Sequence, residues 1–422
     1  MTMRNQVAVS LRAGDRHAGF RRAAAGDAET AEFRLAAACC RWPPSPARDA
    51  AVRSAAAAVT DWDRFAQLAI ARHRVAVLVR DALLSAGVIV PLPIAENLTR
   101  RAQRIARRNM GLATETVRLQ RAFDAAGIAA VALKGVAVGQ LAYGSFAAKH
   151  TKDIDFLVPP ERAEEAMQLL KRENYRLKYP AADLSTSQRR AIIRYNRQFG
   201  FVHRSDRLLV EPHWYAAANP LLLQGIDAYS VTQNVVLSEG NSVRTLATED
   251  LFAYLCVHGA RHAWSRLKWL ADLNALIRTN GADPERLYRH AHSRGAGICA
   301  GLALLLCHRL FDLSLPTDLI SEFQGQKRLR TLAAVAMKTM TATYAESHAS
   351  RSFVERMRVM LAQFLLGRGW EFFFAECRWA SVRTLDMVDL PLPPALHFLY
   401  PLLRLPLWLW RHAKTAGTRN RA

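Results

Sequence analysis

The segment KDIDFLV, residues 152–158, predicts a β-strand with two chemically different faces. Side chains alternate along a strand, so Asp153 and Asp155 share one face and the apolar residues between and after them point to the other. Two carboxylates on one face repel each other, and a cation is therefore expected between them. A divalent metal ion is the simplest candidate, although D-x-D also occurs in surface strands that bind no metal.

Segments on both sides of this strand predict a mixed α/β core. Residues 128–135, IAAVALKG, predict a strand that ends at Gly135, and residues 136–144 predict a helix. Two prolines end the D-x-D strand, and residues 162–174 predict a second helix. Residues 199–214, FGFVHRSDRLLVEPHW, alternate like the two strands of a hairpin, and the second of these strands carries a third carboxylate, Glu211.

The hydropathy pattern divides the chain into five regions. We predict a disordered basic N-terminus (1–30), a helical N-terminal region (31–125), an α/β core (126–240), a helical domain (241–345) and a C-terminal helical and apolar tail (346–422). The predicted fold class is α+β, with a small mixed sheet between helical regions.

Composition indicates a folded, basic, cytoplasmic protein. The chain has 58 Lys plus Arg against 36 Asp plus Glu, a formal net charge of +22, and 51% hydrophobic residues. This excludes a disordered chain, and six cysteines without a C-x-x-C pair indicate reduced thiols rather than a disulfide scaffold. The excess positive charge favours polyanions such as nucleic acid, nucleotide phosphates or an anionic membrane surface, and does not choose among them.

Membrane-spanning and secretory segments are not expected. No apolar run reaches the roughly 18 to 20 residues that a spanning helix needs, and the N-terminus lacks the apolar stretch of a signal peptide. Residues 390–410 are apolar but are interrupted by prolines and Arg404. They predict either a peripheral contact with a membrane or a cover over a hydrophobic groove.

The ordered set of motifs resembles the polymerase-beta-type nucleotidyltransferase superfamily, in particular a bacterial branch of uncharacterised nucleotidyltransferases. The matching segments are LKG (133–135), Tyr143, DIDFLV (153–158), the helix before Tyr175, VEPHW (210–214) and the run from Thr248 to Leu273. The resemblance extends over roughly residues 30 to 280 and rests on the order of the motifs more than on DIDFLV alone.

The resemblance implies a metal-dependent transfer reaction. Asp153, Asp155 and Glu211 would bind two Mg²⁺ ions, which hold a nucleoside triphosphate and activate an acceptor hydroxyl for attack on the α-phosphorus, with pyrophosphate leaving. Glu211 would lie closest to the acceptor, as a base or as a metal ligand.

Two positions depart from the superfamily pattern. Most members have Gly-Ser at the end of the first strand, whereas Gly135 is followed here by Val136. We therefore expect Lys134 and Gly135 to contact phosphate. Lys149 stands where the branch commonly has arginine, and lysine keeps the charge without the bidentate fork. Its predicted role is a phosphate contact, and the alternative is a solvated loop cation.

Four histidines are further candidates. His258 and His262 have the i, i+4 spacing of metal ligands on a helix, but Gly259 stands where an HExxH zinc site requires glutamate. A polar helix face and a contact with nucleotide or acceptor both remain open for this pair. His213 is predicted to orient a metal ligand or to contact the nucleotide or acceptor, and His203 is a candidate partner of Glu211.

The leading hypothesis is a Mg²⁺-dependent nucleotidyltransferase that uses a nucleoside triphosphate and an unidentified acceptor. The alternative is a non-catalytic module of the same fold that binds RNA or a partner through its basic helix at residues 100–108. Sugar, antibiotic, peptide, protein side chain and RNA end all remain open as acceptors, because acceptor pockets are built from variable helices and loops.

Overall fold

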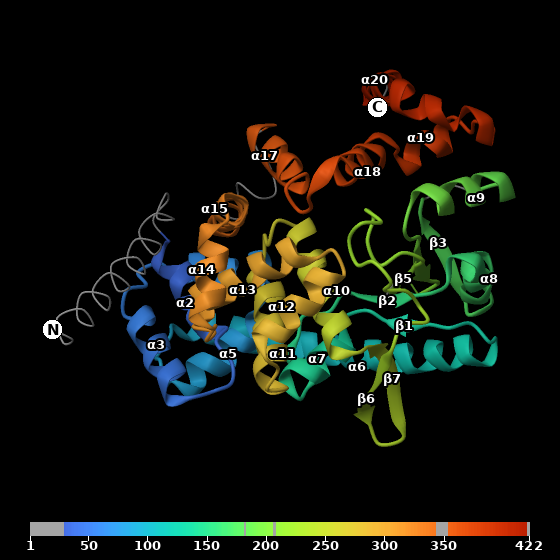
Figure 1. Cartoon of the computed structure of the whole chain (residues 1–422). Helices are drawn as coiled ribbons and strands as arrows, with labels where there is room; N and C mark the ends of the chain where they lie inside the picture. Colours follow the sequence, from blue (N-terminus) through green and yellow to red (C-terminus); the bar gives the residue numbers. More distant parts are fainter. Residues whose placement is uncertain (1–28, 181–182, 206–207, 343–352, 420–422) are drawn as a thin grey trace.

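The computed structural model describes residues 29–180, 183–205, 208–342 and 353–419. Its N-terminal helices, central sheet and C-terminal helices occupy different parts of the molecule (Figure 1). This confirms the predicted α+β class, in which helical regions flank a mixed sheet. The predicted disorder of residues 1–30 falls almost wholly outside the described residues.

In the described residues, seven strands form one sheet in the order β3-β4-β5-β2-β1-β7-β6. Their bounds are β1 (Val131–Ala132), β2 (Asp153–Leu157), β3 (Tyr175–Tyr179), β4 (Gly200–His203), β5 (Leu209–His213), β6 (Thr232–Ser238) and β7 (Asn241–Leu246). β2 runs parallel to β5 and antiparallel to β1, and the predicted hairpin of β4 and β5 is antiparallel.

The alternation along β2 separates two environments, as the sequence predicts. Ile154, Phe156 and Val158 are buried in the cluster that packs against helices α6 and α8. Leu157 belongs to the other cluster, which includes the helices after residue 248. Asp153 and Asp155 share the face of Leu157, so the carboxylates look toward the C-terminal helices.

The N-terminal region is helical and ends in one long helix. Its elements are α2 (Ala31–Cys39), α3 (Pro46–Ala56), α4 (Trp62–Gln67), the short π-helix η1 (Leu68–Arg72), α5 (Ala76–Ser85) and α6 (Leu92–Ala125). Ser45 and Asp61 cap two of these helices with their side-chain oxygens. The helix α6 continues from the basic segment to the start of β1 and packs beneath the sheet (Figure 1).

Helices inside the core and after it complete the scaffold around the sheet. Within the core lie α7 (Val136–Tyr143), η2 (Phe146–Ala148), η3 (Pro160–Arg162), α8 (Ala163–Arg172) and α9 (Thr186–Tyr195). After the sheet follow α10 (Thr248–Arg261), α11 (Leu267–Thr279), α12 (Pro284–Ser293), α13 (Gly297–Phe311), α14 (Thr317–Gly325) and α15 (Lys327–Thr341).

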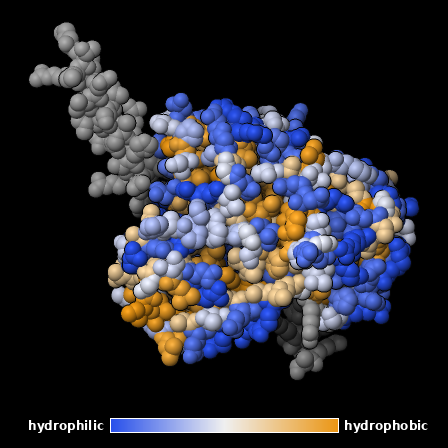
Figure 2. Space-filling model, turned by 90° about the horizontal axis from the view of Figure 1, so that it is seen from below, coloured by the Kyte–Doolittle hydropathy of each residue, from blue (hydrophilic) through white to orange (hydrophobic). Residues whose placement is uncertain are grey.

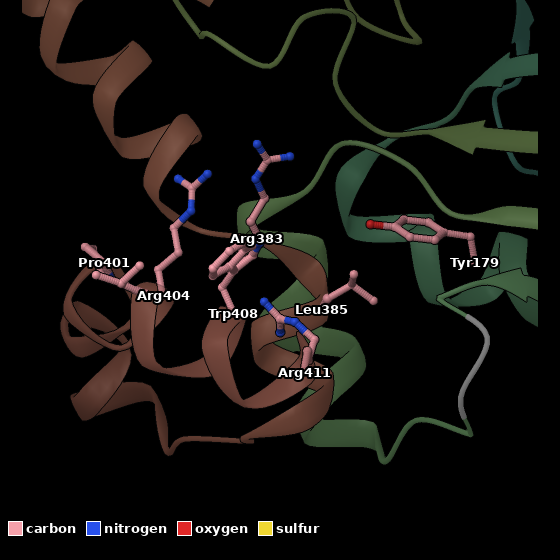
Figure 3. A pocket seen from close by; sticks show the side chains of 8 residues that line it. Tyr179, Arg383, Leu385, Pro401, Arg404, Trp408 and Arg411 are labelled. Carbon is pink, nitrogen blue, oxygen red and sulfur yellow. The ribbon is translucent and has the colours of Figure 1, made fainter. Parts of the chain in front are cut away.

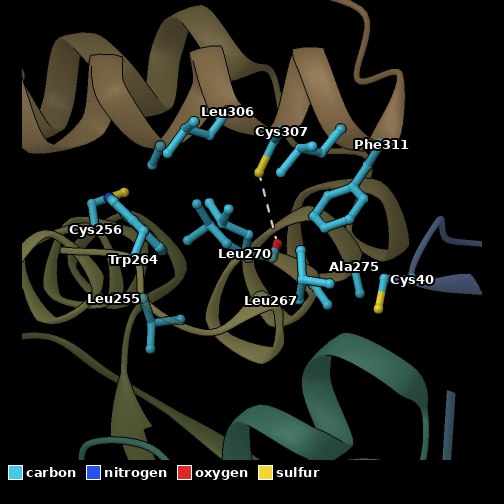
Figure 4. Close-up of a cluster of buried hydrophobic side chains, with 14 of the residues drawn as sticks. Cys40, Leu255, Cys256, Trp264, Leu267, Leu270, Ala275, Leu306, Cys307 and Phe311 are labelled. Atoms are coloured by element: carbon cyan, nitrogen blue, oxygen red, sulfur yellow. Dashed lines mark hydrogen bonds between the residues drawn. The ribbon is translucent and has the colours of Figure 1, made fainter. Parts of the chain in front are cut away.

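Buried apolar side chains pack between the helices α10, α11 and α13. Leu270 and Trp264 are fully buried there, and the Cys307 thiol donates a 3.7 Å hydrogen bond to the Leu270 carbonyl oxygen (Figure 4). Burial raises the pKa of Cys307, so this thiol stays protonated. The six cysteines are free, in agreement with the predicted reduced thiols.

The C-terminal tail forms the helices α17 (Phe353–Gln363), α18 (Gly369–Ser381), α19 (Thr384–Asp389), the 3₁₀ helix η4 (Pro394–Leu399) and α20 (Tyr400–Arg419). These elements extend along one side of the molecule, pass above α9 and turn back toward α18 (Figure 1). Among the helices described, none is both long and apolar enough to cross a bilayer. Figure 2 shows the molecule from below. On this face, hydrophilic residues predominate and hydrophobic residues form separate groups.

Candidate functional site

Adjacent strands bring the three predicted carboxylates together. Asp155 on β2 pairs in register with Glu211 on β5, and Asp153 lies two residues before Asp155 on the same face. Asp155 is 2% exposed, whereas Asp153 and Glu211 are half-buried. The parallel pairing thus brings Asp155 and Glu211, from two distant sequence motifs, within ligand distance of each other, and Asp153 lines the same cavity.

The side chain of Lys134 supplies the cation expected between the two aspartates. Its Nζ lies 2.5 Å from Asp155 Oδ2 and 3.4 Å from Asp153 Oδ1. Burial would lower the pKa of Lys134, but the two aspartates outweigh it and raise this pKa above its ordinary value. Lys134, predicted to contact phosphate, is therefore placed directly against the carboxylates.

His213 holds Asp155 from the opposite side. Its Nε2 lies 3.0 Å from Asp155 Oδ1, and burial lowers the pKa of His213, so the neutral ring donates through Nε2–H. The other ring nitrogen, Nδ1, is buried and has no hydrogen-bond partner in the described part of the chain. Burial opposes ionisation of Asp155, but Lys134 and His213 together hold its pKa below the ordinary value.

Glu211 is the carboxylate that is not neutralised. Gln198 Nε2 donates a 2.9 Å hydrogen bond to Glu211 Oε2, and His213 Nε2 lies 3.9 Å from the same oxygen. Burial and the nearby charge of Asp155 raise the pKa of Glu211 from 4.5 to about 7. Glu211 can therefore accept a proton near neutral pH or bind a metal ion that removes this repulsion.

The loop between α7 and β2 is fixed by the basic helix α6. Asn109 Nδ2 donates to the carbonyl oxygens of Phe146 and Lys149, at 2.7 and 2.5 Å, and Arg108 donates to the Lys152 carbonyl oxygen at 2.7 Å. Several arginines of this helix are exposed, as a solvated helix requires, but its buried Asn109 positions the loop beside the carboxylates.

This loop places Thr151 next to Gly135 at the N-terminus of α7. Gly135 adopts φ +74°, and a Cβ atom there would lie 3.2 Å from Thr151 Cγ2, so glycine suits both the backbone and the close packing. Thr151 is 4% exposed, and its hydroxyl has no hydrogen-bond partner among the described residues. A free hydroxyl beside helix amide groups is a site that suits an anionic oxygen.

Helices α10 and α11 form an aromatic wall opposite the sheet. The His262 ring stacks on Trp269 at 4.8 Å between centroids, and His258 packs edge-on against both rings. Tyr254 lies deeper on the same wall, and its buried hydroxyl has no partner in the described chain. Burial and His262 lower the pKa of His258 well below its ordinary value, so its ring is neutral.

Lys149 is placed differently from a simple phosphate contact. Its ammonium group forms a buried ion pair with Asp272 on α11, and Tyr143 donates to the other oxygen of Asp272 at 3.0 Å. Lys268 lies one turn earlier on α11 and donates to the His150 carbonyl oxygen at 3.3 Å. Burial and Lys149 lower the pKa of Lys268 well below its ordinary value.

All of these elements surround one cavity of about 290 Å³, which we call the carboxylate cavity. Its described lining has seven Lys or Arg side chains and four Asp or Glu side chains. The cations are Arg74, Lys134, Lys149, Lys152, Arg197, Arg266 and Lys268, and the acids are Asp153, Asp155, Glu211 and Asp272. The predicted metal, phosphate and contact residues, including His213, His258 and His262, all line this cavity, whereas His203 does not.

The donor set fits a hard divalent cation. Asp155, Glu211 and His213 each offer a ligand atom within 4.8 Å of the others, and carboxylate oxygens are the ligands that Mg²⁺ prefers. Burial and the charge of Asp155 raise the pKa of Glu211, and a bound cation would counter both effects. The predicted ligand Asp153 does not belong to this group of ligand atoms, and neither do His258 and His262.

Sequence reasoning missed several contacts. His203, a candidate partner of Glu211, instead pairs with Tyr175 across β3 and β4, and Gln198 takes its place beside Glu211. Thr151 and Tyr254 were not predicted, because neither belongs to a charged motif. The β6–β7 hairpin was also missed, although a two-residue turn ending in Gly240 is a recognisable signal.

Comparison with protein-family models identifies the family of this chain. A family model described as uncharacterised nucleotidyltransferase matches residues 58–312. The matched range includes the sheet, the carboxylate cavity and the helices α10 and α11, and it ends before the C-terminal tail. The search of curated proteins found no match.

Proposed function

The chain belongs to the uncharacterised nucleotidyltransferase family, and we propose that it transfers a nucleoside monophosphate from a triphosphate to an acceptor with the help of Mg²⁺. The observation that carries this proposal is the register of Asp155 with Glu211, which gathers oxygen ligands on one face of the sheet. The surrounding cationic lining suits a polyanionic substrate.

The metal-binding residues in this proposal are Asp153, Asp155 and Glu211. Bound Mg²⁺ neutralises charge on the phosphates and lowers the pKa of an oxygen nucleophile. His213 is a positioning residue: its hydrogen bond fixes one oxygen of Asp155, so that the carboxylate keeps its orientation. Lys134 neutralises the aspartates and keeps Asp155 ionised.

The proposed phosphate-binding residues lie around the N-terminus of α7. Gly135 presents the N-terminus of α7, and Thr151 offers a hydroxyl where Val136 offers none. Lys268 on the facing helix α11 lines the same cavity, and a bound anion would counter the burial that lowers its pKa and favour its charged form. We assign these groups, with Lys149 held by Asp272, to the binding of the terminal phosphates.

Glu211 is the proposed base for the acceptor. Without a metal its pKa is about 7, near the pH at which a general base works best. Where Glu211 binds the metal instead, the ion lowers this pKa and Glu211 acts as a ligand. The aromatic wall of His258, His262 and Trp269 is the proposed contact surface for nucleotide or acceptor. Flat aromatic rings can stack on a nucleobase or pack against the apolar face of a sugar.

A label-transfer assay tests this function. The protein is incubated with each of the four triphosphates labelled on the α-phosphate, with Mg²⁺ and with small-molecule or RNA fractions as acceptor sources. We expect labelled product from the natural chain and loss of product, by about three orders of magnitude, in Asp153→Asn and Asp155→Asn, because several kcal/mol of charge stabilisation disappear. Mass spectrometry of the product identifies the acceptor.

The matched control is the exposed Asp183→Asn, which lies outside the carboxylate cavity. It should transfer label at the natural rate. Undiminished transfer in both cavity variants contradicts the proposal. Absence of turnover together with steeply salt-dependent binding of RNA supports the non-catalytic alternative instead.

A further inference from the structure

The C-terminal tail exposes aromatic side chains in a way that the rest of the described chain does not. Every tryptophan and phenylalanine that is exposed in the described residues lies after Gly369. They are Trp370, Phe373, Phe374, Trp379, Phe398, Trp408 and Trp410. Large exposed apolar groups of this kind mark surfaces that meet a partner or a membrane.

The exposed side chains follow helical spacing. On α18, Trp370 and Phe374 are 75% and 64% exposed, and their rings lie 6.2 Å apart with Phe373 beside them. On α20, Leu402, Leu405 and Leu409 are 73%, 64% and 54% exposed at intervals of three and four residues. Two neighbouring helices thus each direct an apolar stripe toward solvent rather than toward the core.

Basic groups accompany these stripes. A groove of about 800 Å³, the C-terminal groove, is lined by Tyr179, Arg383, Leu385, Pro401, Arg404, Leu405, Trp408 and Arg411. Its arginines alternate with apolar side chains, and Tyr179 on β3 closes the far side (Figure 3). Arg411 pairs with Asp386 and Asp389, whereas Arg404 donates to the Ala380 carbonyl oxygen.

The charged side chains of the C-terminal segment, residues 390–422, are all positive. Residues 390–422 contain no aspartate or glutamate, but they contain Arg404, Arg411, Lys414, Arg419 and Arg421. Two arginines of the groove, Arg383 and Arg404, lie close enough to repel each other: burial and Arg383 lower the pKa of Arg404, and Asp386 opposes this shift. An occupant with negative charge relieves this repulsion.

We propose that α18 and α20 bind the surface of an anionic phospholipid bilayer, with their apolar stripes in the interface and the groove arginines against lipid phosphates. Tryptophan, leucine and arginine on amphipathic helices are the residues that interfacial binding uses. The described helices do not span a bilayer, so the contact is peripheral. A second copy of the chain is a poorer occupant, because it would bring two cationic surfaces together.

Co-sedimentation of the full chain with vesicles tests the proposal. The vesicles contain phosphatidylcholine alone or phosphatidylcholine mixed with phosphatidylglycerol. We expect the natural chain to sediment with the anionic vesicles and to be released by salt. Replacing Leu402, Leu405 and Leu409 by serine should lower the partition coefficient at least about tenfold, and Arg404→Gln should lower it about fivefold.

The control is a chain with Ile89→Ser and Val231→Ser, two residues that are 95% and 74% exposed outside the tail. It should bind the vesicles as the natural chain does, and circular dichroism should show that each variant is folded. Equal binding of the triple serine variant, equal binding to neutral vesicles, or no binding at all overturns the proposal. Loss in that variant of a dimer seen by sedimentation velocity, without vesicle binding, assigns the surface to self-association.

Discussion

The carboxylate cavity and the C-terminal groove differ in how their charged side chains are held. In the carboxylate cavity, Asp155 and Glu211 are fixed by adjacent strands, and Lys134 and His213 are bonded to them. In the C-terminal groove, arginines lie among exposed apolar side chains on helices. The groove, at about 800 Å³, is larger than the cavity of about 290 Å³, yet only the cavity combines acids, cations and unpartnered buried polar atoms. The volume of a cavity therefore does not by itself show where a reaction takes place.

The largest expected effect is on stability, and it distinguishes the buried ion pairs of Lys134 from the contact that Arg404 makes in the groove. Lys134→Met removes the ammonium group between two aspartates, and we expect a loss of about 3–5 kcal/mol in the free energy of unfolding, measured by urea titration without metal. Addition of Mg²⁺ should restore part of this loss, because the metal replaces the missing positive charge.

The corresponding change in the groove is Arg404→Met. It removes one hydrogen bond to a carbonyl oxygen and should cost about 1 kcal/mol. Equal losses for the two variants would show that the two hollows hold their charges in the same way.

The next effect concerns the orientation of Asp155. His213→Asn removes the Nε2–H that holds Asp155 Oδ1, and we expect turnover to fall about 10–100-fold with little change in the KM for nucleotide. His203→Asn is the matched control, because His203 lies on the neighbouring strand β4 and does not line the cavity. A similar fall in the control would remove the positioning role.

A smaller effect is expected from the free hydroxyl beside Gly135. Thr151→Val keeps the shape of the side chain but removes the hydroxyl, and the KM for nucleotide should rise about tenfold, the value of one hydrogen bond to a charged group. Thr151→Ser should retain the natural KM.

Thr116→Val provides the control for this substitution, since Thr116 is also buried but bonds to the Leu112 carbonyl oxygen within α6. An unchanged KM in Thr151→Val would mean that the phosphates do not reach the N-terminus of α7.

The smallest effect is a pH dependence of stability in metal-free buffer. The pKa of Glu211 is about 7 in the folded chain and 4.5 without its surroundings, so the folded state binds this proton more tightly. The contribution of the protonated form is complete below pH 4.5 and is lost as the pH rises through 7. Glu211→Gln should therefore raise the Tm by a few degrees at pH 8 and leave it unchanged at pH 4.

Mg²⁺ at pH 8 should raise the Tm of the natural chain but not that of Glu211→Gln to the same extent. If the Tm difference between the natural chain and Glu211→Gln is the same at pH 4 and pH 8, the pKa of Glu211 is not raised by folding. That result would contradict the effect of burial and Asp155 on this carboxyl group.

Short-range sequence patterns were enough to predict the main strands and helices of the core. Alternation along residues 152–158 is a property of consecutive side chains, so it correctly assigned Asp153 and Asp155 to one face and Ile154 to the core. The strand–helix–strand order and the hairpin carrying Glu211 followed from similar short-range signals. The register that makes Gln198 rather than His203 the neighbour of Glu211 did not, because a shift of one residue reverses every side chain.

By itself, the sequence determined the α+β class, the two faces of β2, the helices that flank the sheet and the identity of the charged residues near it. The tertiary structure alone decided that Lys134 lies between the aspartates, that Thr151 lies beside Gly135 and that Lys149 pairs with Asp272. Secondary structure depends on neighbours a few residues apart, whereas Lys149 and Asp272 are separated by 123 positions. Only the packing of α11 against α7 brings such residues together, and this packing depends on the whole buried core rather than on any one motif.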